Sequence, residues 1–192
     1  RGLGDVYKRQ LLGHVDVAFL SLPLGNKDIP YLKVIEEEIF LAAPADHPIF
    51  LAAHRDPSDG HAWIDFETMN GQEFLLYSIN HRLSMFSDQI FADYHITPKV
   101  NQTHDSFETL IRLTEAGMGL TFIPETYIDP RNRLCYFSIG EKGQFRTLVL
   151  GYPPAGYLSK AAQAFSDVVI EILQAQHEEL RAKLKGGPQI GR

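Results

Sequence analysis

The stretch His104–Pro124, HDSFETLIRLTEAGMGLTFIP, predicts a helix followed closely by a buried strand. Asp105 and Glu108 are three residues apart, the spacing of a capping box in which each side chain bonds a free backbone N–H of the first helical turn. Gly117 can take the left-handed conformation that ends a helix without steric cost. Leu120–Ile123 is then a predicted strand, which the next proline ends because proline cannot donate to a sheet. A helix joined to a strand in this way is half of an α/β layer unit.

Strands and helices are predicted to alternate along the rest of the chain as well. The predicted strands are Val15–Leu20, Ile39–Ala43, Phe74–Tyr77, one beginning at Thr97–Val100, Leu134–Phe137 and Thr147–Leu150. One predicted helix carries Leu83, Phe86, Ile90 and Tyr94 on one side, and another spans Leu158–Leu173 with an apolar stripe that includes Phe165, Val168 and Ile172. This alternation predicts an α/β fold with a largely parallel sheet.

Composition narrows the classes of protein. The 192 residues carry a formal charge of −6, and no segment concentrates Lys and Arg, which argues against a nucleic-acid surface on this chain. The single cysteine, Cys135, rules out an internal disulfide and is expected to be a small core residue. The charge run Glu36–Glu38 is expected to be a solvated edge. Because no apolar run approaches the length of a membrane span, we expect a cytoplasmic protein that does not associate with membranes.

The beginning of the chain is unusual. Residues 1–10, RGLGDVYKRQ, show no helix or strand period, yet they lead directly into a core strand. We therefore interpret residues 1–10 as a non-native or disordered lead on a protein truncated at its N-terminus.

Three pieces of sequence in this order resemble the effector-binding domain of LysR-type transcriptional regulators. They are GHVDVAFLSLP at residues 13–23, the pair His47-Pro48 after the second strand, and AGMGLTFIP at residues 116–124. Each piece alone is a weak indication of the family, but the order and spacing of the three pieces together are fairly specific for it. The resemblance extends over about Leu11 to Leu173.

The resemblance implies an α/β, periplasmic-binding-protein-like (type II) fold of two subdomains joined by two crossing hinge strands. Subdomain I, incomplete here, would contain residues 11–43 and 147–173, subdomain II residues 44–146, and residues 174–192 would be a frayed tail. The family binds DNA through an N-terminal winged helix-turn-helix, which we expect to be missing here as a result of the truncation. The implied function is therefore to sense a small-molecule effector, with DNA bound only through the missing domain of a homodimer or tetramer.

The effector site can be placed by physical reasoning as well. In open α/β sheets, ligands collect at the carboxyl ends of strands, where helix N-termini point their N–H groups. The predicted effector-binding residues are Ser21, Pro23, Ser78, His81, Arg82, Thr103, His104, Phe122 and Pro124. Ser78 and Thr103 can hydrogen-bond a carboxylate, and Arg82 or His81 can balance its charge, so we expect a small carboxylate or an aromatic acid. Purely structural roles stay open: a helix cap for Ser78, and solvated side chains for Arg82 and His104.

The spacing of the remaining candidate residues argues against a phosphate-binding loop, a nucleophilic serine and a metal site. Gly117-Met118-Gly119 follows a helix and opens a strand, the reverse of a phosphate-binding loop. Ser78 lacks the glycines of a nucleophile elbow. His54 and His61 flank a turn without enough further ligands for a metal. We therefore predict no catalytic residue, no metal site and no cofactor. Two alternatives stay open: a free solute-binding protein of the same fold that feeds a transporter, and a small enzyme that uses Ser78 with His81 or His104.

Overall fold

A computed structural model of the chain describes residues 15–58, 60–79, 82–153 and 158–184. These residues form two units. The first contains the described residues up to Glu37 together with those of Phe145–Arg181, and the second contains those of Glu38–Gln144 and those from Ala182 on. The chain passes between the units inside one strand, again directly before another, and once more near the end of the last helix. The predicted lead, residues 1–10, lies outside the described residues, as does His81.

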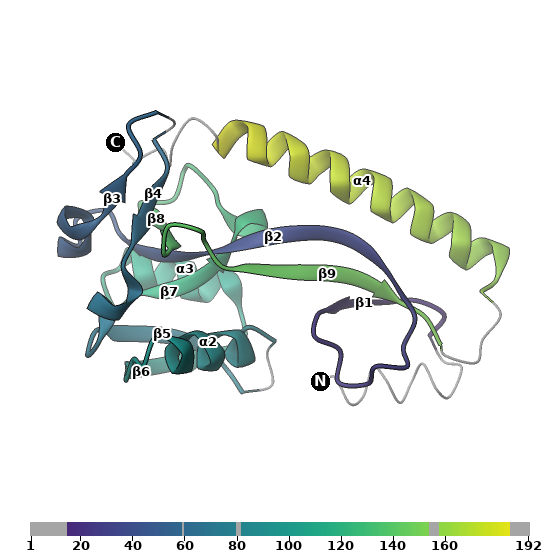
Figure 1. Ribbon diagram of the computed structural model, residues 1–192, viewed down its shortest axis with the longest axis horizontal. Coiled ribbons are helices and arrows are strands. Elements are labelled where there is room, and N and C mark those ends of the chain that lie inside the picture. The colour runs from purple at the N-terminus through teal and green to yellow at the C-terminus, as the bar shows by residue number, and fades with distance from the viewer. Residues whose placement is uncertain (1–14, 59, 80–81, 154–157, 185–192) are drawn as a thin grey trace. The chain divides into compact units, whose positions relative to one another are not determined.

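The first unit is a small sheet packed on one long helix. Its elements are β1 (Ala18–Ser21), the beginning of β2 (Tyr31–Pro44), β9 (Phe145–Gly151) and α4 (Lys160–Leu184). Strand β9 lies between β1 and β2, and β1 runs antiparallel to it. The core is formed by Val34, Ile35, Leu148 and Leu150, with Val169, Ile170 and Leu173 packed against it. In Figure 1, α4 is the long yellow-green helix.

Helix α4 differs from its prediction in length and in part of its apolar stripe. It continues to Leu184 instead of ending at Leu173, because the residues that follow Leu173 are good helix formers with no glycine before Gly186. Of the predicted stripe, Ala162 is buried, and Val169 and Leu173 pack against the core. The prediction is wrong for Phe165, Val168 and Ile172, which are each about half exposed.

The second unit is built on a wider sheet with two helices. Its strands are β3 (His54–Arg55), β4 (Ala62–Ile64), β5 (Glu73–Tyr77), β6 (Lys99–His104), β7 (Thr121–Pro124), β8 (Leu134–Ile139) and the end of β2. Its helices are α2 (Arg82–Asp93) and α3 (Phe107–Glu115), and short 3₁₀ turns span Pro48–Ala52 (η1), Phe66–Met69 (η2) and Glu125–Tyr127 (η3). Strands β7 and β8 pair with opposite edges of β2, β4 and β3 follow β8, and β5 and β6 follow β7.

The prediction of a largely parallel sheet is wrong. Only β5–β6, β4–β8 and the contact of β5 with the start of β7 are parallel among the pairings described, whereas β1–β9, β2–β7, β2–β8 and β3–β4 are antiparallel. Neighbouring strands joined in sequence become parallel only where a long crossover, usually a helix, connects them. Here α2 supplies such a crossover between β5 and β6.

The predicted helix and strand within His104–Pro124 are confirmed as α3 and β7, with one change at the cap. The N-cap is Ser106, not Asp105: its side chain accepts a hydrogen bond from the backbone N–H of Thr109. Gly117 has φ +80°, the left-handed conformation expected at the helix end.

The core of the second unit is rich in aromatic rings. Phe74 lies 5.0 Å from Phe91 and 5.7 Å from Phe122 between ring centroids, and Phe66 contacts all three rings. Cys135 is buried, as predicted.

On the β3–β4 pair, Trp63 stacks with His54 at 5.3 Å and with His61 at 5.7 Å.

The expectation that Glu36–Glu38 is a solvated edge is wrong for Glu37. This residue is fully buried, and Arg146 of β9 donates to it from Nε at 2.7 Å. The strand places alternate residues on opposite faces, so Glu36 is exposed while Glu37 points inward. A buried carboxylate needs such a partner, because burial without one would be very costly.

Candidate functional site

Three neighbouring strands of the second unit end at the same edge. Strand β5 runs parallel to β6, with Tyr77 opposite His104. It also runs beside the start of β7, where Leu75 and Leu120 are joined by a backbone hydrogen bond of 2.8 Å in a parallel arrangement. The residues that end or follow these strands, His104, Ser78 and Pro124, therefore lie along one carboxyl edge.

The helices that follow β5 and β6 leave this edge on opposite faces. Helix α2 packs on the face that carries Phe74 and Phe122, through Phe91. Helix α3 covers the other face, where Phe107 contacts Tyr77 at 5.0 Å. This divergence makes the space between the ends of β5 and β6 a topological switch point, where ligands bind in open α/β sheets. Figure 1 shows both helices beginning beside the strands they follow.

The structure brings Ser78 and His104 together at the switch point. The backbone N–H of Ser78 donates to the carbonyl of His104 at 3.0 Å, which extends the ladder one residue beyond β5. Both side chains are half-buried. The ring of His104 also bonds the Gln102 side chain through Nε2 at 3.0 Å, and Thr103 between them is exposed.

Arg82 begins α2 on the same edge. Its side chain is half-buried, and this burial lowers the pKa of its guanidinium from the ordinary value by removing water from the cation. The group stays charged at any physiological pH, because an arginine pKa is far above neutrality. The site therefore contains a cation that has already lost part of its hydration.

Phe122 and Pro124 contribute differently from the polar residues. The ring of Phe122 is fully buried among the aromatic rings of the core, and its backbone carbonyl accepts a hydrogen bond of 3.0 Å from the Tyr77 hydroxyl. Pro124 is buried and pairs with Ile39 of β2. Both residues belong to β7, the third strand of this edge.

Ser21 and Pro23 belong to the first unit. Ser21 ends β1, is buried, and donates from its hydroxyl to the carbonyl of Leu22 at 3.3 Å. Pro23 is exposed and follows a cis peptide bond from Leu22. Ser21 is thus the last residue of β1, and Pro23 lies two residues beyond it.

Three aromatic residues at this edge were missed by the sequence analysis. Tyr77 ends β5, Phe107 begins α3, and Tyr127 ends η3 after β7. Phe107 and Tyr127 stack with ring centroids 3.9 Å apart and planes 16° apart. The signal that could have identified them is an aromatic residue at or just beyond the end of each of the three strands.

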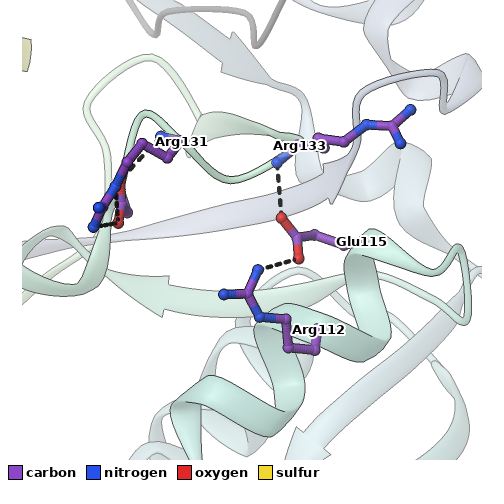
Figure 2. A network of polar contacts seen from close by, with 5 residues as sticks. Arg112, Glu115, Arg131 and Arg133 are labelled. Carbon is purple, nitrogen blue, oxygen red and sulfur yellow. Dashed lines mark hydrogen bonds and ion pairs between the residues drawn. The ribbon is translucent and has the colours of Figure 1, made fainter.

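A second polar cluster lies at the other end of α3 (Figure 2). Glu115 accepts from Arg112 Nη1 at 2.7 Å and from the backbone N–H of Arg133 at 2.8 Å. Burial opposes ionisation of Glu115, but these hydrogen bonds outweigh it and lower its pKa. Hydrogen bonds from Arg131 lower the pKa of Asp129 to about 2. Both carboxylates are thus held ionised by arginines, an arrangement that stabilises the loop before β8 and does not suit proton transfer near neutral pH.

The described part of the chain offers neither a metal site nor a membrane-spanning helix. No group of three or more His, Cys, Asp or Glu side chains there is placed to hold a metal ion. Among the same residues, no helix has the length and apolar character needed to cross a bilayer.

Comparison with known proteins matches most of the chain to one family of domains. A sequence model of the family described as LysR substrate binding domain matches residues 4–174. The "Hydrogen peroxide-inducible genes activator" of Dickeya chrysanthemi is 27% identical over 194 residues, which cover 94% of this chain and 59% of that protein. The first curated relatives are matched over only about half to three fifths of their length.

Solved structures show the same fold. The CcmR regulatory domain of Synechocystis PCC6803, in complex with 2-PG, has a TM-score of 0.74 and 16% identity, over 90% of this chain and 80% of that one. The BenM effector binding domain with its effector benzoate has a TM-score of 0.71 and 18% identity, over 92% of this chain and 77% of that one. The predicted periplasmic-binding-protein-like type II fold is confirmed by these likenesses.

Proposed function

This chain belongs to the LysR substrate binding domain family, and on that premise we propose that it senses a small organic anion at the carboxyl edge of β5, β6 and β7. The observation that carries the proposal is the convergence of Ser78, His104 and Arg82 at the switch point between β5 and β6. Hydroxyl and imidazole groups there can hydrogen-bond an anion, and the half-buried guanidinium supplies the balancing charge.

The helix termini support an anionic effector. Helices α2 and α3 both begin at this edge, and the backbone N–H groups of a first helical turn carry partial positive charge. In our proposal Thr103 adds a donor at the same edge, to which Phe122 and Pro124 also belong. A small carboxylate or an aromatic acid fits this set of groups. Two related domains bind such acids: the BenM effector binding domain binds its effector benzoate, and the effector binding domain of QuiR is in complex with shikimate.

We further propose that Ser21 and Pro23, at the end of β1, also bind the effector. An effector that binds one conformation of the protein better than another shifts the population toward that conformation. It can change that equilibrium only by its difference in affinity for the two arrangements. This population shift is the proposed signal to the rest of the regulator.

Cysteine chemistry favours effector binding over thiol oxidation, although several relatives are named for hydrogen peroxide. A reversible disulfide within one chain needs two thiols, and this sequence has only Cys135. Burial raises the pKa of Cys135, an effect that Arg55 partly opposes, so little reactive thiolate forms.

The proposed role of the whole protein is that of a cytoplasmic transcriptional regulator. In this proposal a winged helix-turn-helix in another segment binds DNA, and the regulator acts as a homodimer or tetramer. Family membership supports this role over that of a solute-binding protein for a transporter, and regulators of this family are not enzymes.

The test is direct binding of small carboxylates to the intact chain, measured by isothermal titration calorimetry with a panel that includes benzoate and shikimate. We expect Ser78→Ala and Arg82→Gln each to weaken binding about tenfold or more, since charge-assisted hydrogen bonds contribute about 1.5–3 kcal/mol. Arg55→Gln, an exposed arginine on β3, is the matched control and should leave affinity unchanged. Equal affinity of all three variants and the unmodified chain would place the site elsewhere.

A further inference from the structure

We infer that Phe107 and Tyr127 form an aromatic wall of the effector site and select carboxylates with a flat, unsaturated ring over saturated ones of similar size. The inference rests on the proposed function, because it assigns the chemical class recognised at the same edge. It concerns two residues that the sequence pattern did not identify.

Phe107 and Tyr127 are the outer two of three aromatic rings in a row that begins at Tyr77. Tyr77 is buried and fixed by the hydrogen bond from its hydroxyl to the carbonyl of Phe122. Phe107 lies against Tyr77 at 5.0 Å with planes 58° apart, and Tyr127 stacks on Phe107 at 3.9 Å with planes 16° apart. The row therefore runs outward from a fixed core residue to an exposed ring.

The position of the rings follows from the three strand ends. Phe107 follows the N-cap Ser106, directly after the end of β6. Tyr127 lies three residues after Pro124, the last residue of β7. Each ring thus stands just beyond one of the strands that define the edge.

Tyr127 presents an aromatic surface that its neighbours leave uncovered. Its side chain is 46% exposed although Phe107 stacks on one of its faces. A flat ring in the ligand can pack against the remaining surface with the offset or edge geometry that aromatic pairs prefer. Since the row is already ordered, little conformational entropy is lost on binding.

The positively charged groups of the edge determine which end of such a ligand they attract. Arg82 and the first turns of α2 and α3 attract the carboxylate. The ring of the ligand is then directed toward the aromatic side of the edge. A saturated ring of the same charge gains the same polar contacts but not the aromatic pairing.

Benzoate and cyclohexanecarboxylate are suitable probes, because they share a charge and differ mainly in ring saturation. We expect the intact chain to bind benzoate about three- to tenfold more tightly, the range that aromatic pairing supplies. Tyr127→Leu should abolish this preference by weakening benzoate only, and Tyr127→Phe should retain it. Tyr31→Leu is the control, since Tyr31 is 48% exposed on β2 of the first unit.

The outcomes separate the two proposals. If the carboxylates bind in a manner that depends on Ser78 and Arg82, but benzoate has no advantage or Tyr127→Leu leaves its advantage unchanged, the aromatic wall is rejected and the proposed function stands. If no carboxylate of the panel binds at millimolar concentration, the anion site is rejected and the aromatic wall with it. Thermal unfolding of each variant checks that the fold is intact.

Discussion

The backbone N–H of Ser78 donates to the carbonyl of His104 at 3.0 Å, and this bond holds the ends of β5 and β6 side by side. The bond uses only main-chain atoms. The Ser78 side chain can therefore be changed without removing this bond.

Two substitutions at Ser78 should separate the role of this side chain from that of the bond. Ser78→Ala keeps the backbone bond, so we expect the free energy of unfolding to change by less than about 0.5 kcal/mol while effector affinity falls. Ser78→Pro removes the donor and should cost about 1–3 kcal/mol, because the carbonyl of His104 loses its partner. Urea unfolding of both variants is the measurement. Equal losses of stability would mean that the side chain is structural.

The buried ion pair between Glu37 and Arg146 should be costly to break. We expect Arg146→Met to lower the free energy of unfolding by about 3–5 kcal/mol, because it removes the cation that is paired with the buried Glu37 carboxylate. The exposed pair Lys33–Glu36 is the control, and Lys33→Met should cost less than about 1 kcal/mol. A double variant with Glu37→Gln and Arg146→Met should recover part of the loss. Similar small effects at both pairs would contradict the burial of Glu37.

Asp129 should contribute to acid stability. Its folded-state pKa, about 2, lies below the ordinary 3.8, so the unfolded chain binds a proton more readily. The stabilisation is therefore fully present above about pH 4 and is lost as pH falls through about 2. Asp129→Asn should remove this part of the pH dependence, and Arg131→Gln should do the same by removing the hydrogen bonds. The measurement is the midpoint of urea unfolding between pH 5 and pH 2, and an unchanged slope in either variant would refute the assignment.

Gly119 should tolerate no side chain. Its φ is +149°, and a Cβ atom there would lie 2.9 Å from the carbonyl oxygen of Glu73, a backbone atom of the neighbouring strand. Gly71 also has a positive φ, +75°, but a Cβ there meets nothing within 4 Å. We expect Gly119→Ala to cost at least about 2 kcal/mol more than Gly71→Ala, since it adds a clash to the backbone strain that both share. Thermal unfolding tests this, and equal costs would show that β5 can move.

The parts of the fold that were predicted correctly depend on neighbours in sequence. Helix α3, the left-handed Gly117 and strand β7 follow from residues within one short stretch. The polar ends of β5 and β6 were also identified, because a strand end is recognised from its own flanking residues.

The parts that were missed depend on partners far along the chain. Glu37 was expected in water because its partner Arg146 is 109 positions away. The stack of Phe107 and Tyr127 requires two different connections to meet at one edge, which no local period indicates. The antiparallel pairing of β2 likewise depends on β7 and β8, which come much later in the sequence.

The indole of Trp63, stacked between two imidazoles, has an optical consequence. It is the only tryptophan of the chain, and it lies in the second unit. Light at the long-wavelength end of the protein's absorption excites tryptophan but not tyrosine. The resulting fluorescence therefore reports on the second unit alone, whereas circular dichroism of the backbone reports on both units. Denaturation followed by the two signals together reveals whether the units melt as one body or in succession, without any added label.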